Sequence, residues 1–426
     1  MSRITAHATF AFHRVGQGLF YDGTINLVNS KCIRLDFVYD CGSTRKNIIK
    51  REVNRYKNYH LASKHLDMLI ISHLHNDHVS GLDELLQDIR VDYVFLPYLS
   101  PAERLILALM YPDMPAWYYD FLHDPIIYLL NRDVGTVVLF GAGGEERGGG
   151  TSPENIPPEP PKEDEKKLWI KLDDASEFKK KLFEEENAQN IYSLYIQEGR
   201  LMVTSHKGYV IALGIWVFRF FNYKLPLKFL NNFHLCVRNI LKDVSIKDAI
   251  RQKNQRERLK KCYESIKNSL DNDFNNTSLM TYHMPIGRNY STKVFPYSSH
   301  IFCYFCRCKP DCYLLFPCGF KGYFGQFLTG DIDLNHDYRK IQNHFQHYLL
   351  HTLLVQIPHH GAYKNWNHDI LRDVPSPSLW IASAGIRNNY GHPNLSVIHE
   401  ILYNGHYFAW SNELEKVIIK GEVEWQ

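Results

Sequence analysis

Apolar and polar positions alternate along the first forty residues, in two stretches that are separated by a glycine-rich turn. The first stretch is "ATFAFHRV" (8–15), and the second is "TINLVNSKCIRLDFVYDCG" (24–42). Both are rich in the β-branched and aromatic residues that favour strands. The pattern therefore predicts a β-hairpin that ends at Asp40, Cys41 and Gly42.

The spacing of apolar residues changes after this hairpin. Residues 44–65 are charged and helical in character, and "LDMLII" (66–71) is the short, continuously apolar run of a strand that is buried on both faces. Residues 80–89 begin with a capping serine and place their leucines on one helical face, and 91–97 predict another strand. The order strand, turn, helix, strand is typical of an α/β protein whose chemistry lies at strand ends.

The rest of the chain continues this mixture of helices and strands. We expect apolar helices over 103–132, a helix over 246–270, and strands at 135–143, 190–222, 275–284, 326–334, 353–362 and 378–385. We interpret 1–426 as a single domain with three additions: a flexible loop rich in Gly, Pro and charge at 144–167, a helical insertion at 223–274 and a cysteine-rich insertion at 285–325.

Composition limits the class of protein. No stretch approaches the roughly 20 consecutive apolar residues that span a bilayer, and the longest apolar candidate, Tyr209 to Phe221, is shorter and contains Arg219. We expect no membrane span. The N-terminus lacks the features of a secretory signal, and nine scattered cysteines do not resemble a disulfide framework, so we expect a cytoplasmic protein with mostly reduced thiols. The net charge of +3 does not by itself identify a polyanionic partner.

The 22 histidines are more informative, because several of them cluster at predicted strand ends. In "SHLHNDHVSG" (72–81), His73 and His75 can converge on one cation, while Asp77 and His78 turn toward a second. Imidazole and carboxylate ligands together suit zinc, with manganese or iron as alternatives when oxygen ligands dominate. Three later strands also end in potential ligands, namely Asp331, the pair His359 and His360, and His392.

Seven motifs occur in the order of one known family. They are "VGQG" (15–18), "YDCG" (39–42), "SHLHNDHVSGL" (72–82), "NNTSL" (275–279), "LTGDI" (328–332), "IPHHGA" (357–362) and "SAGIRNNYGHP" (383–393). The set resembles the metallo-β-lactamase superfamily, and within it the ComEC-like branch, which is named for the hydrolase domain of the bacterial DNA-uptake channel. The resemblance implies a four-layer αββα sandwich with insertions and a two-metal site between its two sheets.

The same resemblance implies roles for individual residues. His73 and His75 would bind one divalent metal, Asp77 and His78 the other, and Asp331 would bridge both. Zinc is the expected metal and manganese the alternative.

The remaining metal positions are less sharply defined. A histidine of "PHHG" would complete the second site; we favour His360 over His359, which could instead face substrate phosphate. The third histidine that is usual in the superfamily has no clear counterpart. His283 could serve as that ligand, or it could be an ordinary histidine on a strand.

The cysteine-rich insertion raises a separate metal question. Its cysteines Cys303, Cys306, Cys308 and Cys312 could hold an additional structural zinc, since thiolates at such spacings can form a tetrahedral site. The spacing is not a familiar paired arrangement, and a hairpin with buried thiols is the alternative.

Two metals would supply a hydroxide nucleophile and stabilise the leaving oxygen of a phosphodiester. Asp77 would orient or deprotonate the nucleophile, and His392 would act as a general acid or a phosphate contact. Substrate-binding candidates are Asn388, Tyr390, Lys364 and Arg387, for which loop hydrogen bonds or solvated positions are the alternative.

We therefore expect a metal-dependent phosphodiesterase or nuclease that acts on DNA or RNA. The alternatives are a small-molecule phosphodiesterase, acting on a nucleotide or choline-phosphate ester, and a partner-gated effector of a phage-defence or toxin-like assembly. A nuclease needs a basic, open groove, whereas a small-substrate enzyme would have an occluded pocket, roofed by the apolar helices of 103–132.

Overall fold

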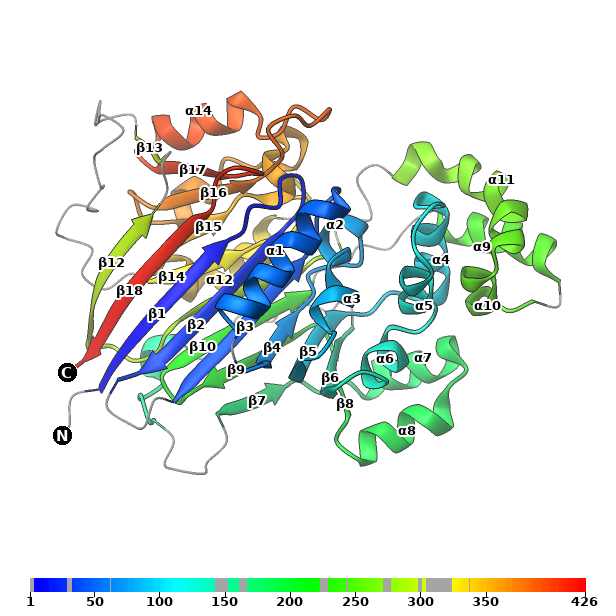
Figure 1. Cartoon of the computed structure of the whole chain (residues 1–426), viewed down its shortest axis with the longest axis horizontal. Helices are drawn as coiled ribbons and strands as arrows, with labels where there is room; N and C mark the ends of the chain where they lie inside the picture. The colour runs from blue at the N-terminus through cyan, green and yellow to red at the C-terminus, as the bar shows by residue number, and fades with distance from the viewer. Residues whose placement is uncertain are drawn as a thin grey trace.

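The computed structural model describes residues 4–28, 33–61, 63–141, 152–160, 167–222, 229–242, 244–270, 277–297, 301–303, 324–336 and 338–426. Two nine-stranded mixed sheets face each other, and helices cover their outer faces (Figure 1). The expected α/β fold, a four-layer αββα sandwich with insertions, is confirmed.

The first sheet contains the N-terminal hairpin and the strand before the histidine motif. Its order is β12 (Tyr290–Tyr297), β18 (Val417–Trp425), β1 (Ile4–Phe12), β2 (Phe20–Leu27), β3 (Arg34–Cys41), β4 (His65–Ile70), β5 (Arg90–Pro97), β6 (Val134–Phe140) and β8 (Leu201–Thr204). From β3 to β8 the neighbouring strands are parallel. The carboxyl ends of these strands therefore lie along one edge of the sheet.

The second sheet contains the later strand-end motifs. Its order is β13 (Ile301–Cys303), β17 (Tyr407–Ser411), β16 (Leu379–Ser383), β15 (Thr352–Gln356), β14 (Gly325–Leu328), β11 (Leu279–Pro285), β10 (Trp216–Asn222), β9 (Lys207–Ala212) and β7 (Leu168–Leu172). The strands from β14 to β17 are parallel, so their carboxyl ends also share an edge. The apolar segment Tyr209 to Phe221 is the antiparallel pair β9 and β10, as expected of buried strands.

Three apolar clusters fill the spaces between the four layers. The inner faces of both sheets share an aromatic core that includes Phe10, Phe37 and Phe218. The helices α1 (Lys46–Tyr59), α3 (Leu82–Leu85), α4 (Pro101–Met110), α5 (Ala116–His123), α6 (Pro125–Leu130), α7 (Ser176–Glu186) and α8 (Gln189–Gln197) pack outside the first sheet. The helices α12 (Tyr338–Leu349), α13 (Ile370–Asp373) and α14 (Leu395–Tyr403) cover the second sheet.

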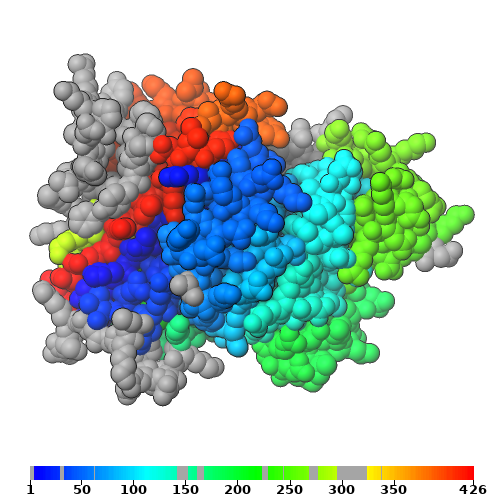
Figure 2. Space-filling model, viewed as in Figure 1, coloured from blue at the N-terminus to red at the C-terminus, as the bar shows by residue number. Residues whose placement is uncertain are grey.

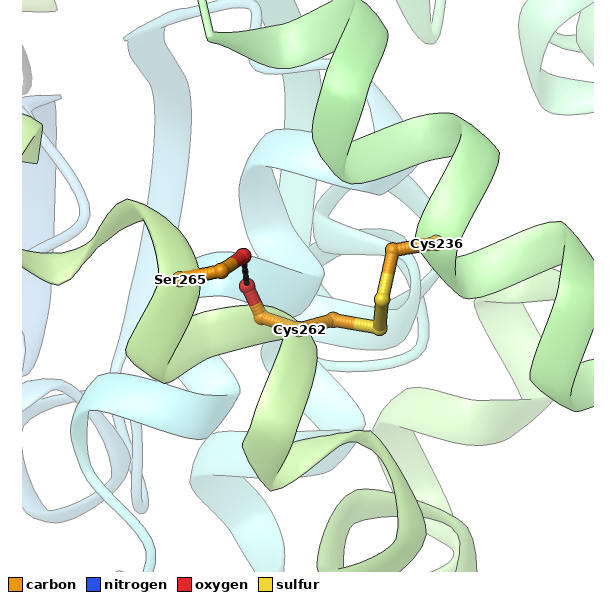
Figure 3. Close-up of a disulfide and its surroundings, with 3 residues drawn as sticks. All are labelled: Cys236, Cys262 and Ser265. Atoms are coloured by element: carbon orange, nitrogen blue, oxygen red, sulfur yellow. Dashed lines mark hydrogen bonds between the residues drawn. A yellow bond between two sulfur atoms is a disulfide. The ribbon is translucent and has the colours of Figure 1, made fainter.

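The predicted helical insertion forms α9 (Leu230–Leu241), α10 (Ile246–Arg251) and α11 (Lys253–Leu270). In Figure 2 these green helices make a lobe beside the cyan segment that contains α4 and α5. The expected helix 246–270 is broken because Gln252 has an extended backbone, with φ −85° and ψ 109°. A disulfide joins Cys236 of α9 to Cys262 of α11 (Figure 3), although scattered cysteines predict mostly reduced thiols.

The other two additions are only partly described. Most of the 144–167 loop, and Cys306, Cys308 and Cys312 of the expected structural zinc site, lie outside the described residues. Cys303 ends the short strand β13. After β11 of the second sheet, the chain crosses to the first sheet, where β12 pairs with β18. None of the helices within the described ranges is long and apolar enough to cross a membrane.

Candidate metal centre

Strand ends from both sheets bring the sequence motifs together. The histidine motif follows β4 and forms the turn and the short helix α2 (Asn76–Val79). Asp331 follows β14, the His359–His360 pair lies in the 3₁₀ turn after β15, and the loop after β16 leads to His392. Because β14, β15 and β16 are parallel, their three loops leave the sheet at one edge and meet the histidine motif there.

Four side chains of this edge form a compact group. The members, each with a potential ligand atom within 4.8 Å of the others, are Asp77, His78, Asp331 and His360. The Nε2 atom of His78 lies 3.2 Å from Oδ1 of Asp331, and Nε2 of His360 lies 3.2 Å from Oδ2 of Asp77. Ligand atoms placed tetrahedrally around zinc at its usual bond length lie about 3.3 Å apart. The spacing of this group therefore suits one metal ion.

Asp331 also faces His73, the first histidine of the motif, which lies beside His75. Its Oδ2 atom lies 3.7 Å from Nε2 of His73, and the rings of His73 and His75 are 4.8 Å apart. The same Oδ2 atom is 3.6 Å from Nε2 of His360 but 3.9 Å from Nε2 of His359. Asp331 thus lies near His73 as well as His78 and His360, and His360 is the closer member of the histidine pair.

The protonation and hydrogen bonding of these rings suit a cation. Within the described part of the chain, the buried Nε2 atom of His73 makes no hydrogen bond, although an unpaired buried nitrogen is costly. Its other ring nitrogen, Nδ1, lies 2.9 Å from the hydroxyl of Ser72. The Nδ1 atom of His360 donates to the carbonyl of Ser383 at 2.7 Å. A ring whose Nδ1–H is occupied in this way presents the Nε2 lone pair to a metal.

Burial and charge set the pKa values in the cluster. Burial lowers the pKa of His73 well below its usual value and that of His75 to about 4, so both rings are neutral near pH 7. Burial opposes ionisation of Asp331, yet the neighbouring histidines hold the pKa of its carboxyl well below its usual range. Burial also acts against His78, but the carboxylates of Asp331 and Asp40 raise its pKa. A bound divalent cation would displace such protons.

Asp40 is a residue of the site to which the sequence analysis assigned no role. It ends the hairpin with a left-handed backbone, φ 55°, and its side chain is fully buried. Its carboxylate accepts hydrogen bonds from the backbone N–H of Ser72 at 2.6 Å and from Nδ1 of His78 at 2.7 Å. The available signal was its position at the end of β3, directly beside the β4 strand end.

The turn that carries the histidine pair is strained. His359 and His360 both adopt left-handed conformations, with φ of 46° and 57°. Such a conformation costs on the order of 1–3 kcal/mol for a non-glycine residue and is found most often at functional sites. Hydrogen bonds at both rings fix the turn: Nδ1 of His359 lies 2.8 Å from Oδ1 of Asn365, and Nδ1 of His360 contacts Ser383.

Residues 35–161 match the family model of the metallo-beta-lactamase superfamily. The match includes the histidine motif but ends before Asp331 and the His359–His360 pair. No curated protein matches the chain. Together with the clustered imidazole and carboxylate groups, the match indicates a metal-dependent hydrolase that binds divalent cations. It does not distinguish the ComEC-like branch from the rest of the superfamily.

Not every predicted ligand reaches this centre. His283 lies midway along β11 and is buried between the sheets, with its ring stacked on Phe218 at 5.2 Å. Trp216 donates to its Nδ1 at 3.2 Å, and its Nε2 lies 2.9 Å from the hydroxyl of Tyr21. Burial lowers the pKa of His283 to about 3. The structure therefore places His283 in a polar chain within the core and not with the ligand group.

A cavity of about 640 Å³ opens over the metal centre. Of the predicted substrate contacts, Lys364, Tyr390 and His392 line it. Asn388 holds its own loop instead: its amide nitrogen donates to the carbonyl of Gly385, and its Oδ1 accepts from the backbone N–H groups of Tyr390 and His392. Arg387 is exposed and is not among the lining residues.

Several lining residues were not predicted from the sequence. They are Gln17 and Thr44 near the first hairpin, Met110 and Tyr111 at the end of α4, and Tyr263 and Lys267 on α11. The ring of Tyr111 lies 6.2 Å from that of His75. The apolar helices of 103–132 are expected to cover a pocket. Of these helices, the end of α4 lines the cavity, and the basic helix α11 lines it as well.

Proposed function

We propose that the chain is a dinuclear metal-dependent phosphodiesterase that cleaves DNA or RNA. The observation that carries this proposal is the position of Asp331, whose carboxylate faces both His73 and His78, in a cavity that Lys364 also lines. In two-metal sites, paired cations stabilise both the attacking and the leaving oxygen of a phosphodiester.

In this proposal the ligands divide into two sets. His73, His75 and Asp331 would hold one ion, and Asp331 would share the second ion with Asp77, His78 and His360. The mixed nitrogen and oxygen donors suit zinc, with manganese as the alternative. When bound, the ions supply positive charge and a water of lowered pKa.

The side chains around the cluster would act on the substrate. Asp77, whose Oδ2 is 3.2 Å from His360, would orient the attacking water or take its proton. His392 would donate a hydrogen bond to a phosphoryl oxygen or to the leaving oxygen; its ring lies 5.6 Å from that of His359. Lys364 would bind the scissile phosphate from the cavity wall.

A small phosphodiester is the second candidate substrate. The cavity volume of about 640 Å³ falls within the range of small-molecule pockets, roughly 300–1,000 Å³. A nucleotide ester would use the same cations and the same Lys364.

The test combines metal analysis with two kinds of substrate. Purified protein supplied with zinc or manganese would be assayed on bis(p-nitrophenyl) phosphate and on labelled single-stranded and duplex oligonucleotides. We expect metal-dependent cleavage that falls at least 10²-fold in His78→Ala and Asp331→Asn. His368→Ala removes an exposed histidine outside the cluster, so it serves as the matched control and should retain activity. Bound metal without cleavage of any phosphodiester would overturn the proposal.

A further inference from the structure

One part of the cavity lining comes from outside the strand-end loops. Tyr263 and Lys267 belong to α11 of the helical insertion, and both line the cavity that contains Asp77, Asp331 and His360. We call these two residues the α11 wall. Because they are four positions apart, they lie on the same face of the helix, one turn from each other.

The packing of α11 holds this face toward the cavity. Leu259, Cys262 and Ile266 are buried at helical spacing in the core cluster that also contains α4. The Cys236–Cys262 disulfide attaches α11 to α9 one residue before Tyr263 (Figure 3). The guanidinium of Arg256 lies 3.6 Å from the ring centre of Tyr119 on α5. The position of the α11 wall is therefore fixed by several independent contacts.

The charge of α11 is uneven compared with the whole chain. Its eighteen residues include six basic and only two acidic side chains, in a protein of net charge +3. Two of the basic residues are engaged in structure: Arg256 stacks on Tyr119, and Arg258 donates to the carbonyl of Ile240 at 2.8 Å. Lys267 is the basic residue of α11 that lines the cavity.

Aromatic side chains accompany this lysine. The tyrosines that line the cavity are Tyr111, Tyr263, Tyr363 and Tyr390. Tyr363 and Tyr390 are 56% and 68% exposed, and one face of the Tyr390 ring lies against His392, with 5.7 Å between the ring centres. Tyrosine faces interleaved with lysines form the surface that binds unpaired nucleotides, since each base offers a face for stacking and each phosphate a charge.

We propose that the α11 wall is a binding subsite for single-stranded nucleic acid, next to the position of the scissile phosphate; this inference rests on the proposed phosphodiesterase function. Lys267 binds a phosphate that neighbours the cleaved one, and Tyr263 packs against the adjacent base. In a duplex the faces of the bases are stacked on one another, so the subsite selects an unpaired strand. A small phosphodiester has no neighbouring phosphate for Lys267 to bind.

Binding to a labelled single-stranded oligonucleotide, followed by fluorescence anisotropy over a range of salt concentrations, tests the subsite directly. Lys267→Ala should weaken binding several-fold and reduce the slope of log affinity against log salt by about 0.7, the value for one phosphate contact on a single strand. Lys260→Ala removes the same charge from an exposed position of the same helix that does not line the cavity. This control should leave both quantities nearly unchanged.

Two further measurements separate the possible results. The first is hydrolysis of bis(p-nitrophenyl) phosphate, which should proceed at the same rate in Lys267→Ala as in the wild type. The second is oligonucleotide binding by two Tyr263 variants: Tyr263→Ala should weaken it, whereas Tyr263→Phe, which keeps the aromatic ring, should not. Equal effects of Lys267→Ala and Lys260→Ala, or equal affinity for duplex and single strand, would overturn the subsite while leaving the phosphodiesterase intact. Strand binding that depends on Lys267, without hydrolysis of any phosphodiester, would support the subsite and overturn the proposed function.

Discussion

Replacing Asp40 by asparagine tests whether the metal centre depends on a residue that does not contact the cavity. Asp40 is fully buried, and its carboxylate fixes Nδ1 of His78 at 2.7 Å and the backbone N–H of Ser72 at 2.6 Å. Asparagine has the same shape and keeps one acceptor for Ser72. It presents an N–H₂ group to the ring nitrogen of His78, so the imidazole must move its proton to Nε2 or turn away.

The size of the effect follows from these contacts. The Oδ2 atom of Asp40 accepts from Nδ1 of His78 and from the hydroxyl of Ser72. Loss of the charge-assisted hydrogen bond to His78 alone costs about 1.5–3 kcal/mol. If the hydrogen bond is lost only in the metal-bound state, this free energy corresponds to a loss of about 10- to 150-fold in metal affinity. Mutation of residues that hydrogen-bond to metal ligands typically lowers metal affinity about 10- to 100-fold. We expect the metal of the group containing His78 to bind about 10- to 100-fold more weakly in Asp40→Asn.

Competition between the protein and a chromophoric chelator measures this affinity. Asp36→Asn is a matched control, because Asp36 is a buried carboxylate on the same strand that pairs with Arg34 and Thr24, away from the centre. Circular dichroism would check that both variants fold. Metal affinity of Asp40→Asn within twofold of the wild type would refute the role assigned to Asp40.

Three other predictions concern stability. Removing metal with a chelator should lower the melting temperature measured by calorimetry, since an ion at 100 times its Kd contributes about 2.7 kcal/mol; an unchanged melting temperature would contradict the metal centre. His283 is neutral in the fold with a pKa of about 3, so its contribution to stability is intact above its unfolded pKa of about 6.5 and falls as the pH drops toward 3. His283→Phe should remove this part of the pH dependence in urea unfolding curves and keep the wild-type metal content; a lower metal content would contradict its placement in the core. Cys236→Ser opens a loop with a sequence separation of 26, which should cost about 3–4 kcal/mol, and a reductant should have the same effect on the wild type but none on the variant.

The clustering of Asp77, His78, Asp331 and His360 could be predicted because each of them follows a predicted strand. The order of strand and ligand-rich turn places His73 to His78 after β4, and parallel strands bring Asp331 and His360 to the same edge. His283 could have been separated from this group by position alone. It lies in the middle of β11 rather than at its end, and such a residue faces a sheet surface instead of the edge.

The cavity walls could not be predicted in the same way. Tyr263 and Lys267 reach the cavity only because α11 packs beside α4. The sequence of a helix does not indicate which other helix it will pack against. The same limit applies to the Cys236–Cys262 pair, since its two residues meet through the packing of α9 on α11. Contacts between helices of different segments produce no recognisable sequence motif, whereas histidines and aspartates at strand ends do.

The pairing of the first strand with the last has a practical consequence for experiments on long substrates. Ile4 pairs with Trp425, while the other end of β1 leads through Val15 to Gln17 in the cavity wall. The nine residues of β1 span about 30 Å, and the two described ends of the chain lie side by side at the far end of this strand from Val15 (Figure 1). A tether, fluorophore or affinity tag attached at either end would leave the cavity mouth unobstructed. The molecule can therefore be fixed to a surface with its cavity accessible to a stretched polymer.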